Sequence, residues 1–285
     1  MQLRRSQASL AGFQAPARQS EFTPWMSSKP LLTPNDPAPA LVLNPGAASP
    51  FLLVGDHAGR AVPRGLNDLG VSAADMERHI AWDLGVAELG VRLSAALGAC
   101  FLSQRYSRLV IDSNRDPART DAIPSVSDET VIPGNADLTP EAAQARERAI
   151  HAPYQAAIAH ELDDRARKGL PTVLVALHSF TPRMAGFDRP WRYGVLHRGD
   201  SAFSSAVLAL LVEAHGDAVG DNLPYRMDEV DYTIPFHADA RGLDYLELEV
   251  RQDLLAGAAG LQAVTDMVAA LLPRALQRTG AASRA

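Results

Sequence analysis

The sequence has only one cysteine, Cys100, and no hydrophobic run close to the roughly 20 residues that span a bilayer. A single cysteine excludes an internal disulfide and any zinc or iron–sulfur site made of several thiolates. Basic side chains are also few: 27 Lys and Arg stand against 33 Asp and Glu, which gives a net charge of -6, whereas a nucleic-acid-binding protein normally has a basic face. We therefore expect a cytoplasmic protein with neither a nucleic-acid nor a membrane partner.

Three common signatures are missing as well. There is no Walker phosphate-binding loop, no GxSxG nucleophile elbow and no glycine-rich dinucleotide fingerprint. The stretch after the arginines at positions 4 and 5 is too polar for the core of a secretory signal. These absences argue against several large enzyme classes and against export.

Prolines divide the chain into two parts. Residues 1–50 contain seven prolines between Pro16 and Pro45 and no apolar periodicity, which predicts an N-terminal arm that is extended or partly disordered. Residues 51–280 are expected to form a single domain, because strand and helix patterns alternate there. Strands are expected at 51–54, 100–102, 109–111, 172–177, 193–196 and 244–251. Helices are expected from a capping box at Ser72 to Val91, from Thr139 to Gly169, and over 202–215 and 254–276.

This alternation predicts an α/β protein with a mostly parallel sheet that is covered by helices on both faces. Residues 113–137 interrupt it with a polar, proline-containing segment, and loops of this length usually form lids or binding loops. In open α/β sheets, ligands bind beyond the carboxyl ends of the strands. We therefore expect an active site at that edge of the sheet, with residues 113–137 beside it.

Polar side chains follow the expected strands at the point where each one ends. His57 follows the first strand, Asn114 and Arg115 follow the third, and His178 and Ser179 follow the fourth. Two histidines and one carboxylate are the protein ligands of zinc in many hydrolytic sites, where the fourth position is left open for water. The sequence therefore predicts His57 and His178 as metal ligands.

The sequence leaves the third ligand open between two aspartates. Asp83 is our choice, because it lies four residues after His79 and both side chains would share one face of the expected helix. Asp56, beside His57, is the alternative. A helix carboxylate in an ordinary salt bridge would explain Asp83 almost as well.

Glu249 and Arg108 are the expected catalytic residues. A carboxylate on a buried strand needs a proton, an arginine or a metal nearby, so Glu249 is either a general base beside a metal or the ion-pair partner of Arg251. Arg108 would polarise a carbonyl group or hold a carboxylate. Asn114 and Arg115 would bind a substrate carboxylate, since a guanidinium can hold one through two hydrogen bonds. The other expected substrate-binding residues are Ser179, His237 and Arg251.

Five short motifs resemble those of the N-formylglutamate amidohydrolase family. They occur in order between about residues 50 and 255: GDHAG at 55–59 with Pro63, HIAWDLG at 79–85, YSRLVIDSNR at 106–115, HSFTP at 178–182 and EVRQD at 249–253. The resemblance implies an enzyme of amino-acid catabolism that hydrolyses the formyl or acyl amide of an N-acylated amino acid. The substrate that it implies is N-formyl-L-glutamate, a small anionic molecule.

That family is similar to the zinc carboxypeptidases, which implies a three-layer α/β/α fold with a mixed central sheet. The likeness also implies one zinc ion, with another divalent metal as an alternative, held by His57 and His178, and Glu249 as the catalytic glutamate. The chain departs from the carboxypeptidase pattern at Arg60, where those enzymes place a glutamate ligand three residues after the first histidine. A carboxypeptidase-like peptidase, a deacylase of another N-acyl amino acid and a non-catalytic binding protein remain alternatives, and a homodimer stays open.

Overall fold

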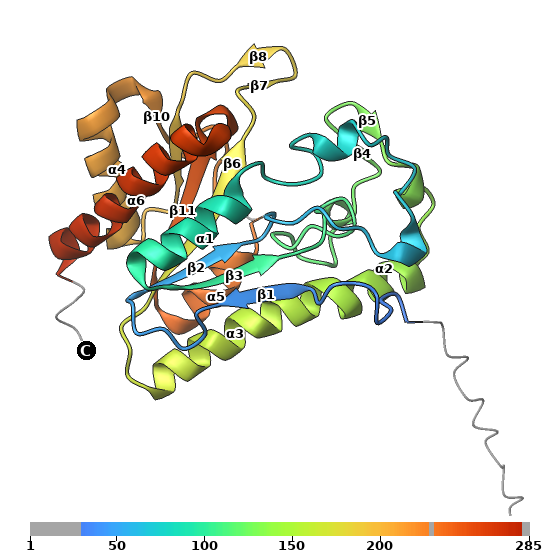
Figure 1. Ribbon diagram of the computed structural model, residues 1–285, viewed down its shortest axis with the longest axis horizontal. Coiled ribbons are helices and arrows are strands. Elements are labelled where there is room, and N and C mark those ends of the chain that lie inside the picture. The colour runs from blue at the N-terminus through green and yellow to red at the C-terminus, as the bar shows by residue number, and fades with distance from the viewer. Residues whose placement is uncertain (1–29, 228–230, 281–285) are drawn as a thin grey trace, which may run out of the picture.

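A seven-stranded mixed sheet forms the middle layer of the molecule, with helices on both faces (Figure 1). The structure is a computed structural model and describes residues 30–227 and 231–280. The strand order is β1-β3-β2-β6-β11-β9-β10. The strands are β1 (Ala40–Leu43), β2 (Phe51–Gly55), β3 (Cys100–Gln104), β6 (Val173–Phe180), β9 (Tyr193–Leu196), β10 (Val219–Asp221) and β11 (Asp244–Arg251). Neighbours run parallel except in the pairs β1–β3 and β11–β9, which confirms the predicted mostly parallel, mixed sheet in a three-layer α/β/α fold.

The helices are divided between the two faces of the sheet. Helices α1 (Val86–Leu97), α4 (Ala202–His215) and α6 (Gly257–Thr279) cover one face, and α3 (Ala152–Arg167) and α5 (Thr233–His237) cover the other. Helix α2 (Pro140–Arg146) runs into α3 through a π-helical turn at Glu147–His151. The Thr139 side chain accepts a hydrogen bond from the Ala142 backbone nitrogen, so the predicted cap at the start of α2 is confirmed.

Alternating side chains along the strands build a separate core on each face. On β11, Leu246, Leu248 and Val250 belong to the core under α1, α4 and α6. Tyr245, one residue out of phase, belongs to the core under α3 and α5. Because side chains alternate with a period of two, Glu247 and Glu249 lie on the same face as Tyr245. The alternation in the sequence therefore places two carboxylates on the α3–α5 face of a buried strand.

Part of the segment predicted as an N-terminal arm joins the sheet. Strand β1 pairs antiparallel with β3 at the sheet edge, and the Arg105 backbone nitrogen donates to the Pro39 carbonyl at 2.9 Å. Residues 1–29 of the predicted arm lie outside the described residues.

The helix predicted between Ser72 and Val91 is wrong over most of its length. The Ser72 hydroxyl does accept a hydrogen bond from the Asp75 backbone nitrogen at 3.1 Å, but only one 3-10 turn follows it. Helix α1 begins at Val86, because Gly85 before it has a φ of 83°, which L-residues rarely adopt. His79 and Asp83 therefore lie in a loop and do not share a helix face.

The strand predicted at 109–111 is also absent, and the chain there forms a turn. Leu109, Val110 and Ile111 are nonetheless fully buried, in a third core under the loops beyond the strand ends, together with Ile80 and Tyr106. A short apolar run indicates that the residues are buried. It does not distinguish a buried strand from a buried loop, because both give the same run.

Two short hairpins lie above the carboxyl ends of the central strands (Figure 1). One, β4 (Val126–Ser127) with β5 (Thr130–Val131), belongs to the predicted long loop, and the other is β7 (Arg183–Met184) with β8 (Phe187–Asp188). Among the described residues, no helix is both long enough and apolar enough to cross a membrane.

Candidate active site

The pairing of β6 with β11 places His178 directly beside Glu249. The two residues are register partners in this parallel pair, and both are buried. On the other side of β11, Gly194 is the register partner of Glu249, and a Cβ at Gly194 would lie 3.2 Å from the Glu249 Cβ and 2.3 Å from the Leu223 carbonyl oxygen. The strand register therefore fixes the imidazole and the carboxylate next to each other without any contribution from loops.

A cavity of about 390 Å³ opens at this edge of the sheet. It is lined by residues from the ends of β2, β6 and β11 and from residues 113–137, the segment that the sequence predicted to lie beside the site. Most of the predicted site residues line this cavity: His57, Asp83, Arg108, Asn114, Arg115, His178, Ser179 and Glu249.

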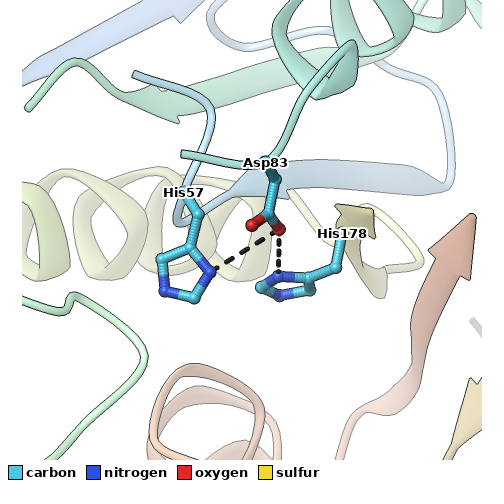
Figure 2. A group of neighbouring side chains, drawn as sticks. All are labelled: His57, Asp83 and His178. Carbon is cyan, nitrogen blue, oxygen red and sulfur yellow. Dashed lines mark hydrogen bonds and ion pairs between the residues drawn. The ribbon is translucent and has the colours of Figure 1, made fainter. Parts of the chain in front are cut away.

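His57, Asp83 and His178, which all line the cavity, each point one donor atom toward the others (Figure 2). The Asp83 Oδ2 atom lies 3.6 Å from His57 Nδ1 and 3.0 Å from His178 Nδ1, and all three donor atoms lie within 4.8 Å of one another. Two ligands about 2.1 Å from one zinc ion in tetrahedral geometry would be about 3.4 Å apart. The spacing of these three side chains therefore fits a metal ion.

The backbone around Asp83 explains how a loop residue reaches this group. The Asp83 backbone nitrogen donates to the His57 carbonyl at 2.8 Å, and the Ser179 backbone nitrogen donates to Asp83 Oδ2 at 3.2 Å. The Ser179 hydroxyl donates to the Leu84 carbonyl at 2.9 Å. Ser179, predicted to bind substrate, thus uses its hydroxyl to hold the Asp83 loop against β6.

Each imidazole has a second carboxylate at its other nitrogen. His57 Nε2 is 2.6 Å from Asp112 Oδ1, and His178 Nε2 is 3.6 Å from Asp56 Oδ2. Asp56 in turn accepts a hydrogen bond from the Thr233 hydroxyl at 2.8 Å. Such pairs are typical of metal-ligating histidines, whose far nitrogen donates to a carboxylate that fixes the ring. Asp56, the alternative ligand, therefore lies where an orienting partner would lie, on the opposite side of His178 from Asp83.

The charges in the site favour a bound cation. Burial raises the pKa of Asp83, but the imidazoles of His57 and His178 hold that pKa below its usual range. Burial opposes a charge on His178, and Asp56 and Asp83 nevertheless raise its pKa well above the ordinary value. The His57 Nδ1 atom is buried and has no hydrogen-bond partner among the described residues. A dense carboxylate cluster with an unpartnered imidazole nitrogen is a donor set that suits a divalent metal.

Glu249, like Asp56 and Glu247 in the same site, forms no ion pair with an arginine of the described residues. Burial raises the pKa of Glu249 to about 7, and Asp83 adds to the rise while His178 opposes it. The predicted alternative, an ion pair with Arg251, is not observed, because Arg251 is 2.8 Å from Asp253. Arg251 also does not line the cavity, so its predicted contact with substrate has no support in the geometry.

Arg108, Asn114 and Arg115, predicted to contact substrate, also form hydrogen bonds or ion pairs within the protein. Arg108 Nη2 donates to Asp112 at 2.7 Å, and its Nη1 lies 3.5 Å from Asp83. The Asn114 side-chain oxygen accepts hydrogen bonds from the backbone nitrogens of residues 232 and 233, both at 2.9 Å. Asn114 thus fixes the start of α5. Arg115 remains at the cavity wall, where its Nη1 donates to the Asn114 carbonyl at 2.9 Å and lies 3.6 Å from Asp231.

His237 lies behind the site and does not line the cavity. Its Nε2 atom is 2.8 Å from the Gln155 side-chain oxygen, and Gln155 donates to the Thr233 hydroxyl, which reaches Asp56. His237 is thus the buried end of a hydrogen-bond chain that leads to Asp56, and its contact with substrate stays a prediction. Among the cavity-lining residues that sequence reasoning missed are Tyr225, Arg226, Asp231 and Glu247. Tyr225, Arg226 and Asp231 do not lie at the end of any strand expected from the sequence, so no signal marked them. Glu247 lies within β11, where the alternation of side chains did indicate its position.

We expect His237 to make the stability of the protein depend on pH. Burial lowers the pKa of His237 to about 4, against an ordinary value of about 6.5 for an unfolded chain. Between these values the unfolded chain binds a proton that the folded chain does not, so the free energy of unfolding falls as the pH drops from about 6.5 to about 4, by up to about 3 kcal/mol. Urea unfolding of wild type and His237→Gln at several pH values measures this, and the variant should lose that part of the slope. His160→Gln, which removes an exposed imidazole from α3, should keep the wild-type slope; a His237→Gln slope equal to that of wild type would contradict the prediction.

Comparison with known proteins adds a family and two structures. Residues 49–256 match the family described as N-formylglutamate amidohydrolase. A gene product of Agrobacterium tumefaciens is similar in structure with a TM-score of 0.84 and 34% sequence identity, over 88% of this chain and 99% of that chain. An N-formylglutamate amidohydrolase from Ralstonia eutropha JMP134 is similar with a TM-score of 0.64 and 22% identity, over 86% of this chain and 100% of that chain. A search of curated proteins found no match.

Proposed function

Because the chain belongs to the N-formylglutamate amidohydrolase family, we propose that this amidohydrolase cleaves the formyl amide of N-formyl-L-glutamate to formate and glutamate. The observation that carries the proposal is the group of His57, Asp83 and His178 beside the buried carboxylate of Glu249, at the base of one cavity. We expect the reaction to take place in the cytoplasm, with a small anionic N-acyl amino acid as the partner.

We propose that His57, Asp83 and His178 hold one zinc ion. When bound, zinc would supply Lewis-acid chemistry, which polarises a carbonyl group and makes water more acidic. Asp112 is hydrogen-bonded to the far nitrogen of His57, and Asp56 lies 3.6 Å from the far nitrogen of His178, so these two carboxylates would orient the ligand atoms for a metal. The support for a metal is the donor set and the excess of buried carboxylates around it.

Glu249 is the residue that we assign to proton transfer. Its raised pKa, about 7, is near the value at which a general base is most effective at neutral pH. In its ionised form Glu249 takes a proton from the water that attacks the formyl carbon. It then returns this proton to the nitrogen of the leaving amine, which departs as the amino group of glutamate. The carboxylate ends the cycle in its initial state.

Two arginines at the cavity wall match the two carboxylates of N-formylglutamate. Arg115 is fixed by its hydrogen bond to the Asn114 carbonyl. Arg226 also lines the cavity, and none of the described residues forms an ion pair or a hydrogen bond with its side chain. A guanidinium at a cavity wall attracts a substrate anion, and the contact would be charge-assisted. We assign Arg115 to the α-carboxylate of the substrate and Arg226 to its side-chain carboxylate.

The test compares acyl amino acids on the purified, zinc-supplemented chain. We expect the highest kcat/KM for N-formylglutamate, a lower value for its uncharged isostere N-formylglutamine, and little hydrolysis of N-acetylglutamate or of short peptides. Arg226→Ala should lower kcat/KM for N-formylglutamate by about 10- to 100-fold through KM, since a hydrogen bond to a charged group contributes about 1.5–3 kcal/mol. It should change the value for N-formylglutamine much less.

Arg274→Ala, which removes an exposed arginine from α6, is the matched control and should behave as wild type. Faster cleavage of N-acetylglutamate would mean that the enzyme prefers another acyl group to the formyl group. Faster cleavage of peptides would mean that it acts on peptide bonds. The absence of hydrolysis of every compound by the metal-loaded wild type would overturn the proposed function.

A further inference from the structure

Arg189 is a buried cation that has no carboxylate partner among the described residues. Arg189 is only 8% exposed. Its guanidinium lies 4.8 Å from the centre of the Tyr225 ring and 5.9 Å from that of Phe180. The guanidinium donates to the Tyr225 hydroxyl at 3.0 Å, to the Met184 sulfur at 3.0 Å and to the Thr181 carbonyl at 3.4 Å. Burying a charge without a counter-charge is unfavourable, so this arrangement needs an explanation other than an ion pair.

The hydrogen bond from Arg189 leaves the Tyr225 hydroxyl with a hydrogen to donate. A phenol both donates and accepts, and here its oxygen already accepts from the guanidinium. None of the described residues accepts a hydrogen bond from it, and Tyr225 lines the cavity. Burial and the charge of Glu249 raise the pKa of Tyr225, so that the phenol keeps its proton at neutral pH, while Arg189 and Arg108 act in the opposite direction. Two of these charges, those of Glu249 and Arg108, belong to the predicted catalytic residues.

Arg108, which the sequence predicts to polarise a carbonyl group or to hold a carboxylate, already has two carboxylate neighbours. Its guanidinium donates to Asp112 at 2.7 Å and lies 3.5 Å from Asp83. Two carboxylates at these distances compensate its charge, which weakens it as a donor to a substrate oxygen. A further protein donor would therefore add to the stabilisation that the proposed metal gives to the charge on the acyl oxygen.

We propose that Tyr225 donates a hydrogen bond to the acyl oxygen of the substrate as that oxygen becomes negatively charged, and that Arg189 holds the phenol in place for this contact. The inference rests on the proposed function. Tyr225 is then a catalytic residue and Arg189 a positioning residue. No proton leaves the phenol: the hydrogen bond strengthens as the carbonyl double bond opens and weakens when it re-forms. A cation behind the phenol makes it a better donor.

The first experiment measures kcat and KM of Tyr225→Phe with the best N-acyl amino acid on metal-loaded protein. Removal of one oxyanion donor typically lowers the rate by about 10²- to 10³-fold, so we expect kcat to fall by about 10²-fold and KM to change less than about threefold. Tyr193→Phe, which removes a hydroxyl outside the cavity, should keep the wild-type kcat. Metal content and the thermal unfolding midpoint should match those of wild type, since only one oxygen is lost.

The second experiment separates Arg189 from a merely structural role. Arg189→Met should lower kcat, and Arg189→Lys should restore part of it. In the Tyr225→Phe background, Arg189→Met should lower kcat by no more than about threefold further, because both changes remove the same interaction. The pKa of the Tyr225 phenol can be measured by subtracting the titration of a Tyr225→Phe protein from that of the same protein with Tyr225. This pKa should be higher in Arg189→Met than in wild type.

Each outcome is decisive. A Tyr225→Phe enzyme with wild-type kcat overturns the proposal, and so does a rise in KM at unchanged kcat, which would mean that Tyr225 binds substrate and transition state equally. Losses from Arg189→Met and Tyr225→Phe that multiply would show that Arg189 does not act through the phenol. Hydrolysis by wild type together with any of these results leaves the proposed function standing, whereas a wild type without hydrolysis removes both.

Discussion

Glu249→Gln is expected to lower kcat for formyl-amide hydrolysis by about 10³-fold while the protein keeps its metal. General acid–base catalysis contributes about 10²- to 10⁴-fold, and the amide of glutamine can neither take a proton from water nor return one to the amine. Glutamine has the shape of glutamate, and the ligand group of His57, Asp83 and His178 does not include position 249. Steady-state kinetics and metal analysis of the same preparation test the prediction.

Glu247 offers a matched control two residues away on the same face of β11. Burial raises the pKa of Glu247 well above its ordinary value, and Asp231 adds to the rise, which favours the neutral acid. Glu247→Gln then replaces one neutral group by another of the same shape, and we expect kcat to fall less than about tenfold. An equal loss in both variants would contradict the assignment of the base to Glu249.

The kcat/KM of the wild type should also depend on pH in the way that a general base at Glu249 predicts. Glu249 must be ionised to accept a proton, so kcat/KM should fall by about tenfold per pH unit below its pKa. Burial sets that pKa at about 7 in the metal-free protein, and a bound cation would lower it, which places the acidic limb at or below about pH 7. Glu249→Gln should lack this limb in its residual activity.

The strands that carry the site could be predicted because burial and pairing leave a local pattern. The alternation of residues 244–251 identified β11 with the bounds that the structure shows, and it assigned Glu249 to the face opposite Leu248. The apolar run at 193–196 and the helix at 202–215 were also predicted with their observed bounds. The sequence comparison confirms the family that the five motifs indicated.

The contacts between distant segments could not be predicted, because no local pattern encodes them. The interaction of His57 with Asp112 joins residues 55 positions apart, and it depends on a loop that the sequence presented as a strand. Asp83 was proposed as a ligand from helical spacing to His79, yet no helix is present there. What brings Asp83 to the histidines is the hydrogen bond from its backbone nitrogen to the His57 carbonyl. The residue was named for a reason that the structure does not support.

Asp83→Asn is expected to remove bound metal and nearly all activity, and comparison with Asp56→Asn decides between the two aspartates. Loss of an orienting partner typically lowers metal affinity by about 10- to 100-fold, and loss of a ligand should lower it by more than about 10²-fold. Both substitutions are isosteric, and both aspartates are buried beside His178, on opposite sides of its ring. Zinc content after equilibration with a competing chelator ranks the two variants without reference to activity.

The same measurement has a predictable pH dependence, which a site made only of neutral ligands would not show. In the metal-free protein, Asp112 and Asp83 raise the pKa of His57 against the effects of burial and Arg108, and Asp56 and Asp83 raise that of His178. A metal must displace these protons, so zinc affinity should decrease as the pH falls, and binding should release protons into a weak buffer. Asp83→Asn removes a charge that favours both protons, so the residual affinity should depend less on pH. If Asp56→Asn instead loses the metal while Asp83→Asn retains it, Asp83 is not the ligand.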